Sequence, residues 1–239
     1  MVSMPKPHQD DLPFAAPVGA LRRPPPASVR ELEIRAQALY GHALGDIARG
    51  LGVDPPPDPK RAKGFVGQLI ERALGADPAA GEKPDFPELG VELKTIPMHA
   101  DGRIAESTFC CSIRMDQADQ AVWATSRLRK KLARVLWVPV QSARTNPLLE
   151  RRVGRARLWE PSSAESDALQ RDWEDLMGAL GSGRQVDAYE GEILQMRPKG
   201  ANAAVRSLAP TEDGAAPTLP LGFYLRVHFT QSILLKSSA

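Results

Sequence analysis

The chain has 239 residues, long enough for one domain with a substantial core or for one domain divided into two lobes. Its formal net charge of +2 excludes a protein that coats DNA through bulk positive charge. No segment has the apolar core of a signal peptide or the length of a membrane span, so we expect a soluble, cytoplasmic protein without membrane contact.

The expected elements begin after a proline-rich tail. Residues 1–27 show little periodicity, which predicts disorder. Ser28 and Glu31 then have the spacing of a capping box and should open a helix that ends near Gly41. Further helices are expected over 44–49, 64–74, 126–133 and 168–180. Strands are expected over 91–96, 108–113, 135–140, 193–197 and 223–227. Strands interleaved with helices indicate an α/β domain.

The segment from Pro84 to Pro97 carries the strongest candidate for chemistry. Strand side chains alternate between faces, so Glu92 and Lys94 should point to the same side, and Asp85 can fold back towards Glu92. Two carboxylates ~4 Å apart repel by roughly 4 kcal/mol at an effective dielectric constant near 20, so the pair needs a cation or a shared proton. Mg²⁺ prefers oxygen ligands and fits that need. The alternative is an amphipathic edge strand with solvated charges.

The cysteines and histidines do not indicate a second metal site. Cys110 and Cys111 are adjacent on an expected strand and should face opposite sides, which favours reduced thiols over a disulfide. The four histidines are scattered without the spacing of zinc ligands.

Positive charge is clustered although the net charge is small. One group contains Arg127, Arg129, Lys130, Lys131 and Arg134, and a second contains Arg144, Arg151, Arg152, Arg155 and Arg157. Such patches are typical of phosphate contact, with a solvated helix face and a basic loop as the alternative.

Asp…Glu-x-Lys is the signature of the PD-(D/E)xK restriction-endonuclease-like superfamily, and the surrounding text resembles the MutH family. The similar blocks follow in order as KGFVGQLIERALGA (63–76), FPELGVELKTIP (86–97), RVLWVPV (134–140), RRVGRARLWEP (151–161), LQMRPKGANA (194–203) and LPLGFYLRVHFT (219–230). The resemblance implies a mixed sheet flanked by helices, with two lobes around a DNA cleft. Residues 28–239 would form this endonuclease domain, with the catalytic lobe mainly in its first half and the DNA-recognition lobe mainly in its second.

The resemblance also implies roles for individual residues. Asp85, Glu92 and Glu71 would hold the metal, although the helical wheel alone makes Glu71 a solvated surface residue. Lys94 would be catalytic, and so would Lys131, for which the adjacent Lys130 leaves a shift of one residue open.

Three DNA-binding residues are implied in the same way. Lys63 would lie near phosphates, Arg197 would read a guanine, and Tyr224 would lie near the target adenine. The alternatives are a surface lysine, a strand-end arginine paired with a carboxylate and a tyrosine half-buried in a sheet.

The implied activity is Mg²⁺-dependent nicking of double-stranded DNA by a monomer. The cut would fall 5′ of G in the unmethylated strand of hemimethylated GATC, in methyl-directed mismatch repair, with activation by MutL and with MutS acting upstream. One alternative is a Sau3AI-type GATC restriction endonuclease, for whose second domain copy the chain is too short. Another is a non-catalytic DNA-binding or MutL-docking protein, against which the joint presence of Asp85, Glu92 and Lys94 argues.

Overall fold

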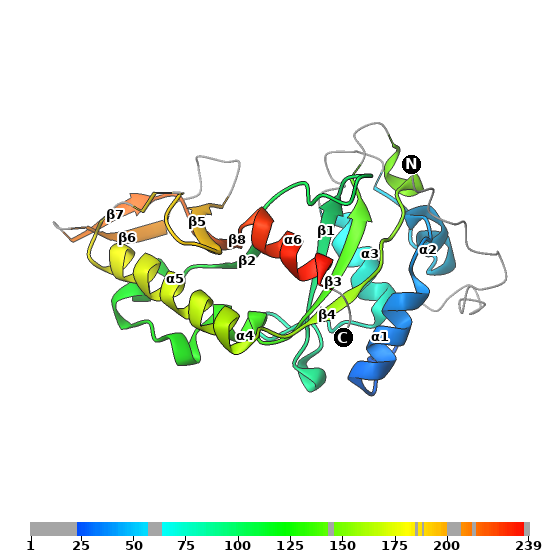
Figure 1. Cartoon of the computed structure of the whole chain (residues 1–239), viewed down its shortest axis with the longest axis horizontal. Helices are drawn as coiled ribbons and strands as arrows, with labels where there is room; N and C mark the ends of the chain where they lie inside the picture. Colours follow the sequence, from blue (N-terminus) through cyan, green and yellow to red (C-terminus); the bar gives the residue numbers. More distant parts are fainter. Residues whose placement is uncertain are drawn as a thin grey trace. The chain divides into compact units, whose positions relative to one another are not determined.

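A computed structural model describes residues 23–56, 64–142, 146–184, 186–187, 189–199, 207–211 and 214–236. The predicted tail up to residue 22 and the candidate Lys63 lie outside the described residues. The chain divides into two compact units, each described by itself below (Figure 1). The first comprises Met1–Ala105 with Arg134–Trp159, and the second comprises Glu106–Ala133 with Glu160–Ala239.

Three helices open the first unit: α1 (Val29–Ala38), α2 (Leu44–Gly50) and α3 (Phe65–Leu74). The hydroxyl of Ser28 accepts the backbone N–H of Glu31 at 3.1 Å, as the sequence predicts, whereas the Glu31 carboxylate accepts from Ala27. Gly75 ends α3 at a φ of 84°, where a Cβ would lie 2.4 Å from the Pro24 carbonyl oxygen. This close approach requires glycine.

The segment before α1 packs against this unit. The Arg35 guanidinium donates to the carbonyl oxygens of Pro24 and Leu74, and Pro26 is buried. Residues 23–27, which the sequence analysis included in a disordered tail, therefore contact α1 and the end of α3.

The sheet of the first unit has the order β1-β3-β4, with β1 at an edge. Its strands are β1 (Glu92–Met98), β3 (Val135–Gln141) and β4 (Arg157–Trp159). β1 and β3 are parallel from Glu92 opposite Val135 onwards, and β4 is antiparallel to β3. Short 3-10 helices at Pro87–Leu89 and Leu148–Glu150 complete the unit.

The core of the first unit lies between this sheet and its helices. Leu93, Leu136 and Val138 from the sheet form one buried cluster with the apolar stripe of α3, which includes Leu69 and Ile70. In Figure 1 α3 lies beside β1. Because strand residues alternate, Glu92 and Lys94 project from the opposite face of the sheet.

The second unit contains a sheet of order β2-β8-β5, antiparallel throughout, and a separate antiparallel pair, β6-β7. Its strands are β2 (Thr108–Ser112), β5 (Leu194–Pro198), β6 (Ser207–Thr211), β7 (Gly214–Thr218) and β8 (Leu221–Leu225). Its helices are α4 (Arg127–Leu132), α5 (Ser163–Gly181) and α6 (Val227–Leu235), with 3-10 helices at Met115–Gln120 and Trp123–Thr125. The Trp123 and Trp173 rings pack 5.7 Å apart between centroids.

The strand expected over 223–227 is wrong at its end. β8 stops at Leu225, Arg226 precedes the first turn, and α6 begins at Val227. Phe229 and Ile233 of α6 are buried at helical spacing, a signal that the sequence analysis did not use. Likewise α5 begins five residues before its expected start, because Ser162 and Glu165 form a capping box.

The two cysteines lie at a β-bulge. Pairing between β2 and β8 passes from Phe109 to Cys111, so Cys110 is an extra residue in the strand. The bulge breaks the alternation that should have put the cysteines on opposite faces, and both are buried thiols outside any disulfide.

No helix in the described part of the chain is both long enough and apolar enough to cross a membrane.

Candidate active site

Asp85 is held against the outer edge of β1. Its carboxylate oxygen Oδ2 accepts the backbone N–H of Leu93 at 2.8 Å, and its own carbonyl accepts the N–H of Asp77 at 2.8 Å. Glu92 is the residue before Leu93, and its backbone N–H points to the other side of the strand, where it donates to the Arg134 carbonyl. Asp85 therefore folds back onto the strand beside Glu92, as the sequence analysis anticipated.

Glu92 and Lys94 form an ion pair on one face of β1. The Lys94 Nζ lies 2.5 Å from the Glu92 Oε1, and the two side chains are 16% and 2% exposed. A carboxylate so deeply buried requires a compensating positive charge, which Lys94 supplies. The alternative of a solvated edge strand is thus wrong for this pair. On the neighbouring strand, the backbone of Trp137 is opposite Lys94, and the Trp137 ring packs at a tilt against that of Trp159, with 6.3 Å between centroids.

Glu71 lies closer to β1 than its helical position suggests. A Cβ built on Gly67 would lie 3.7 Å from the Thr95 hydroxyl and 3.9 Å from a Glu71 carboxylate oxygen. The Glu71 side chain therefore leans back along α3 towards Gly67, in the direction that helical side chains favour, and it is half-buried. The apolar stripe alone could not reveal this direction of the side chain.

The described residues contain no group of three or more His, Cys, Asp or Glu side chains already arranged around one point as a metal cage. Asp85 nevertheless bonds the β1 backbone one residue from Glu92. Glu71 comes from α3, which packs on the other face of β1 from Glu92. These donors are oxygens, as Mg²⁺ prefers, so the chemistry of the set fits a hard divalent cation.

Lys131 and Lys130 differ in their surroundings. Lys131 is buried in α4 of the second unit, whereas Lys130 is exposed. Burial of an ammonium group costs free energy unless the group has a partner or a function. The burial of Lys131 therefore favours it over Lys130 as the lysine to which the resemblance gives a catalytic role.

Arg197 and Tyr224 meet on the sheet of the second unit. The Arg197 guanidinium carbon lies 5.6 Å from the Tyr224 ring centroid, and its NH1 donates to the Ser107 hydroxyl at 2.9 Å. The predicted alternative of an arginine paired with a carboxylate does not describe Arg197, which is exposed on an edge strand and bonds a hydroxyl. Tyr224 is half-buried in the sheet, as its alternative predicted.

Phe109 and Lys199 extend this arrangement and were missed by the sequence analysis. The Phe109 ring packs edge-on against Tyr224 at 5.3 Å, and the Lys199 Nζ lies 4.3 Å from the Phe109 centroid and 2.9 Å from the Ser112 hydroxyl. The two aromatic rings thus contact each other, and each ring also contacts one cation. We call Arg197, Tyr224, Phe109 and Lys199 the cation-aromatic row.

Gly222 makes room for this row. A Cβ at Gly222 would lie 2.8 Å from the Phe109 ring and 3.2 Å from the Cys111 carbonyl oxygen. We expect Gly222→Ala to displace Phe109 and to lower the free energy of unfolding by about 1–3 kcal/mol, the usual cost of overpacking. Urea denaturation would measure it.

Gly178→Ala is the matched control for that substitution. Gly178 lies within α5 with nothing within 4 Å of an added Cβ, so alanine there should stabilise the helix by about 0.5–1 kcal/mol. Equal stability changes in the two variants would contradict the steric argument.

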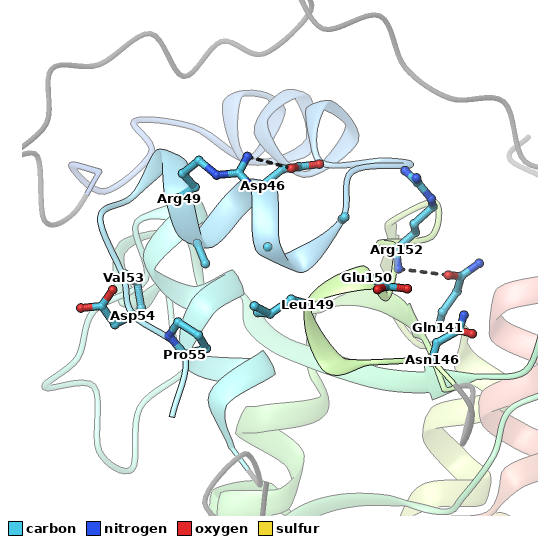
Figure 2. Close-up of a pocket in the computed structure, with 13 residues that line it drawn as sticks. Asp46, Arg49, Val53, Asp54, Pro55, Gln141, Asn146, Leu149, Glu150 and Arg152 are labelled. Atoms are coloured by element: carbon cyan, nitrogen blue, oxygen red, sulfur yellow. Dashed lines mark hydrogen bonds and ion pairs between the residues drawn. The ribbon is translucent and has the colours of Figure 1, made fainter. Parts of the chain in front are cut away.

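A pocket of about 880 Å³ lies elsewhere in the first unit (Figure 2). It is lined by α2 and by the segment that includes Leu149 and Arg152, whose backbone N–H donates to the Gln141 side chain. Gln141 is the last residue of β3, whereas Glu92 is opposite the first, so the pocket lies at the other end of the sheet from the carboxylates.

Comparison with known proteins decides the family. The family model described as "DNA mismatch repair enzyme MutH" matches residues 74–172, a range that contains Asp85, Glu92, Lys94 and Lys131. A protein of Serratia proteamaculans named DNA mismatch repair protein MutH is 47% identical over 218 residues, covering 89% of this chain and 95% of the relative. Proteins of the same name from Shewanella amazonensis and Yersinia enterocolitica are each 46% identical, covering 88% and 89% of this chain and 95% and 94% of the relatives.

The chain belongs to the MutH family. Membership confirms the family that the sequence blocks indicated, together with the restriction-endonuclease-like α/β fold class. It also confirms the expected enzyme class, a DNA endonuclease of mismatch repair. The carboxylates and Lys94 on β1 are accordingly the candidate active site of a MutH-family enzyme.

Proposed function

We propose that this protein nicks the unmethylated strand of hemimethylated GATC sites in double-stranded DNA, 5′ of the guanine. It would use Mg²⁺ and act as a cytoplasmic monomer that MutL activates once MutS has found a mismatch. The observation that carries the proposal is the placement of Asp85 on the Leu93 N–H, directly beside the buried Glu92–Lys94 pair.

The candidate metal ligands are Asp85, Glu92 and Glu71, all in the first unit. When bound, Mg²⁺ would offset charge on the phosphate oxygens and lower the pKa of a coordinated water. Glu92 would exchange part of its interaction with Lys94 for this cation. Asp85, held by a backbone N–H, would keep its orientation through that exchange.

Lys94 would then serve the reacting phosphate. Its ammonium lies on the same face of β1 as Glu92, so it can orient the attacking water and stabilise negative charge in the transition state. Lys131 would add a second positive charge, a role for which its burial supports it over Lys130.

Base recognition would come from the cation-aromatic row. An arginine suits the paired acceptors O6 and N7 of guanine in the major groove. Tyr224, which packs between Arg197 and the edge of Phe109, would contact the adenine. An N6-methyl group on that adenine projects into the same groove and would meet the Tyr224 ring. Lys63 would contact phosphates, as the family resemblance implies.

Divalent cations should stabilise the folded protein. We expect Mg²⁺ or Ca²⁺ to raise the melting temperature, because an ion that binds only the native state stabilises it by about 2.7 kcal/mol at 100 times its Kd. The shift should shrink in Asp85→Asn, whose carbonyl oxygen can still accept the Leu93 N–H. Equal shifts in both proteins, measured by thermal denaturation, would place the stabilising ion elsewhere.

Nick mapping tests the proposed function directly. Purified protein, Mg²⁺ and MutL would be incubated with plasmids carrying unmethylated, hemimethylated or fully methylated GATC. We expect nicks 5′ of G in unmethylated strands only. Double-strand cuts at every GATC would favour a restriction endonuclease, and binding without cleavage would favour a non-catalytic protein.

A further inference from the structure

The strand that carries Arg197 is held in place by contacts at its start. β5 pairs only with β8 among the described strands, so it is an edge strand with one hydrogen-bonded neighbour. Arg197 is its fourth residue and is exposed, whereas Leu194, Gln195 and Met196 are buried. The position of Arg197 therefore depends on the hydrogen bonds between β5 and β8 and on the contacts that hold the turn before Leu194.

Asp172 fixes that turn from α5. It is 6% exposed, and its carboxylate accepts three consecutive backbone N–H groups. Oδ1 accepts from Glu192 at 2.9 Å, and Oδ2 accepts from Ile193 at 2.7 Å and Leu194 at 2.8 Å. Hydrogen bonds to an ionised acceptor are roughly twice as strong as neutral ones. Nothing in the proposed chemistry uses this carboxylate, which lies among buried apolar residues of α5 such as Leu169, Trp173 and Leu176.

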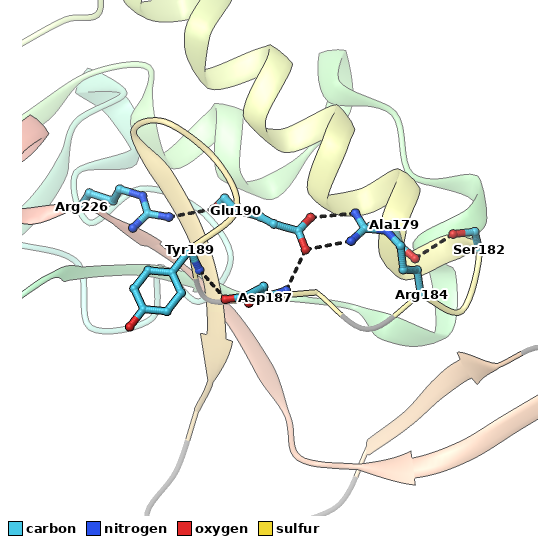
Figure 3. Close-up of polar contacts among 7 residues, drawn as sticks. All are labelled: Ala179, Ser182, Arg184, Asp187, Tyr189, Glu190 and Arg226. Atoms are coloured by element: carbon cyan, nitrogen blue, oxygen red, sulfur yellow. Dashed lines mark hydrogen bonds and ion pairs between the residues drawn. The ribbon is translucent and has the colours of Figure 1, made fainter.

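Arg226 holds the same turn by donating hydrogen bonds to the backbone carbonyls of the turn. Its Nε donates to the Gly191 carbonyl at 3.0 Å, and its NH2 donates to the Glu190 carbonyl at 2.9 Å. Its backbone N–H also donates to the Ile193 carbonyl at 2.9 Å. Figure 3 shows the guanidinium directed at Glu190. Since Arg226 joins β8 to α6, it ties the start of β5 to the end of the strand that carries Tyr224.

The turn itself admits no larger residue at Gly191. Its φ is 85°, and a Cβ there would lie 2.2 Å from the Leu194 carbonyl oxygen and 3.4 Å from the Asp172 carboxyl carbon. Upstream, Arg184 pairs with Glu190 through two hydrogen bonds of 2.8 and 2.7 Å (Figure 3). The Arg184 guanidinium, followed by the backbone N–H of Asp187, lowers the pKa of Glu190 to about 2.

We propose that Asp172 and Arg226 are positioning residues that set the placement of β5, and thereby of Arg197 against Tyr224, for reading the guanine. We call Asp172, Arg226 and the turn 190–194 the strand anchor. The identity of the base that Arg197 reads rests on the proposed function, whereas the strand anchor rests only on the contacts described above. Base readout by a bidentate contact tolerates little displacement, so loosening the anchor weakens discrimination before it unfolds the protein.

The test compares Asp172→Asn with Asp175→Asn. Asp175 is an exposed carboxylate on the same helix, three residues away, and serves as the matched control. An asparagine at 172 keeps one acceptor oxygen and turns an NH2 group towards backbone donors. Arg226→Lys, which keeps the charge but loses the planar fork, gives a second variant at the other side of the anchor.

Two measurements are made on each protein. The first is the ratio of kcat/KM for GATC to that for a duplex with the guanine replaced, which we expect to fall about 10-fold in Asp172→Asn and Arg226→Lys and to stay unchanged in Asp175→Asn. A merely structural loss reduces the active fraction equally for both substrates and leaves the ratio unmoved. A lower melting temperature with an unchanged ratio would overturn the positioning role.

The second measurement is hydrogen exchange without DNA. The amides of residues 192–194 should exchange at least about 10-fold faster in both anchor variants, with exchange in the first turns of α5 unchanged. Unchanged exchange at 192–194 overturns the anchor by itself. A wild-type protein with no preference at the guanine would instead overturn the proposed function, and exchange would still decide the anchor.

Discussion

Replacing Glu92 by alanine should reduce nicking by roughly 10³-fold or more while DNA binding in Ca²⁺ is largely retained. The side chain is 2% exposed and is both the partner of Lys94 and a candidate metal ligand. Its loss removes several kcal/mol of transition-state charge stabilisation, and each 1.36 kcal/mol corresponds to a tenfold change in rate. Asp85→Ala should have an effect of the same size. Single-turnover nicking of a GATC plasmid would measure both.

Glu88→Ala is the matched control for the carboxylate substitutions. Glu88 lies between Asp85 and Glu92 in sequence, on the 3-10 helix Pro87–Leu89, and it is exposed. Its removal should leave the nicking rate within a factor of about two, as for surface substitutions generally. Wild-type rates in Glu92→Ala would show that the active site has been assigned to the wrong residues.

Arg197→Ala should relax the preference for guanine, with a loss of about 1–3 kcal/mol of discrimination. The exposed guanidinium rests against Tyr224 and Ser107, so its removal disturbs little of the buried core. Lys63→Ala should instead weaken binding to all sequences alike and reduce the slope of log K against log salt by about one. Competition between GATC and single-base variants at several salt concentrations would measure both effects.

Arg197→Lys separates charge from geometry. A lysine keeps the positive charge but presents a point ammonium in place of a planar fork, so affinity should recover more than discrimination. Full discrimination at the guanine in Arg197→Ala would mean that another residue reads this base.

Local patterns predicted those parts of the site that depend on neighbouring residues. Alternation along one strand was enough to put Glu92 and Lys94 on the same side, and their ion pair agrees with it. The turn before the strand allowed Asp85 to fold back, and it bonds the Leu93 N–H. The glycines on either side of α3 marked its limits.

The missed features depend on contacts between distant segments. Phe109 and Lys199 meet only because β2 and β5 both flank β8 in a particular register, which no local pattern encodes. Asp172 lies among apolar residues of a helical stripe, where a carboxylate is explained only by the backbone N–H groups of a turn 20 residues away. Periodicity placed Glu71 at the surface because it does not show that the side chain leans back along α3 towards Gly67, beside Thr95 of β1.

The bond between Asp85 and Leu93 also bears on self-association. β1 is an edge strand, and its outer side is bordered by Phe86, which bridges to Val91, and by Ile104, which bridges to Met98. Between these two bridges, the Asp85 carboxylate accepts the backbone N–H of Leu93. A strand from another molecule could otherwise pair with this N–H. Asp85→Ala should therefore expose a backbone donor that Glu92→Ala leaves covered, so two equally inactive proteins should differ in their tendency to aggregate. Asp85→Asn, which retains an acceptor oxygen for the Leu93 N–H, should keep this strand edge covered.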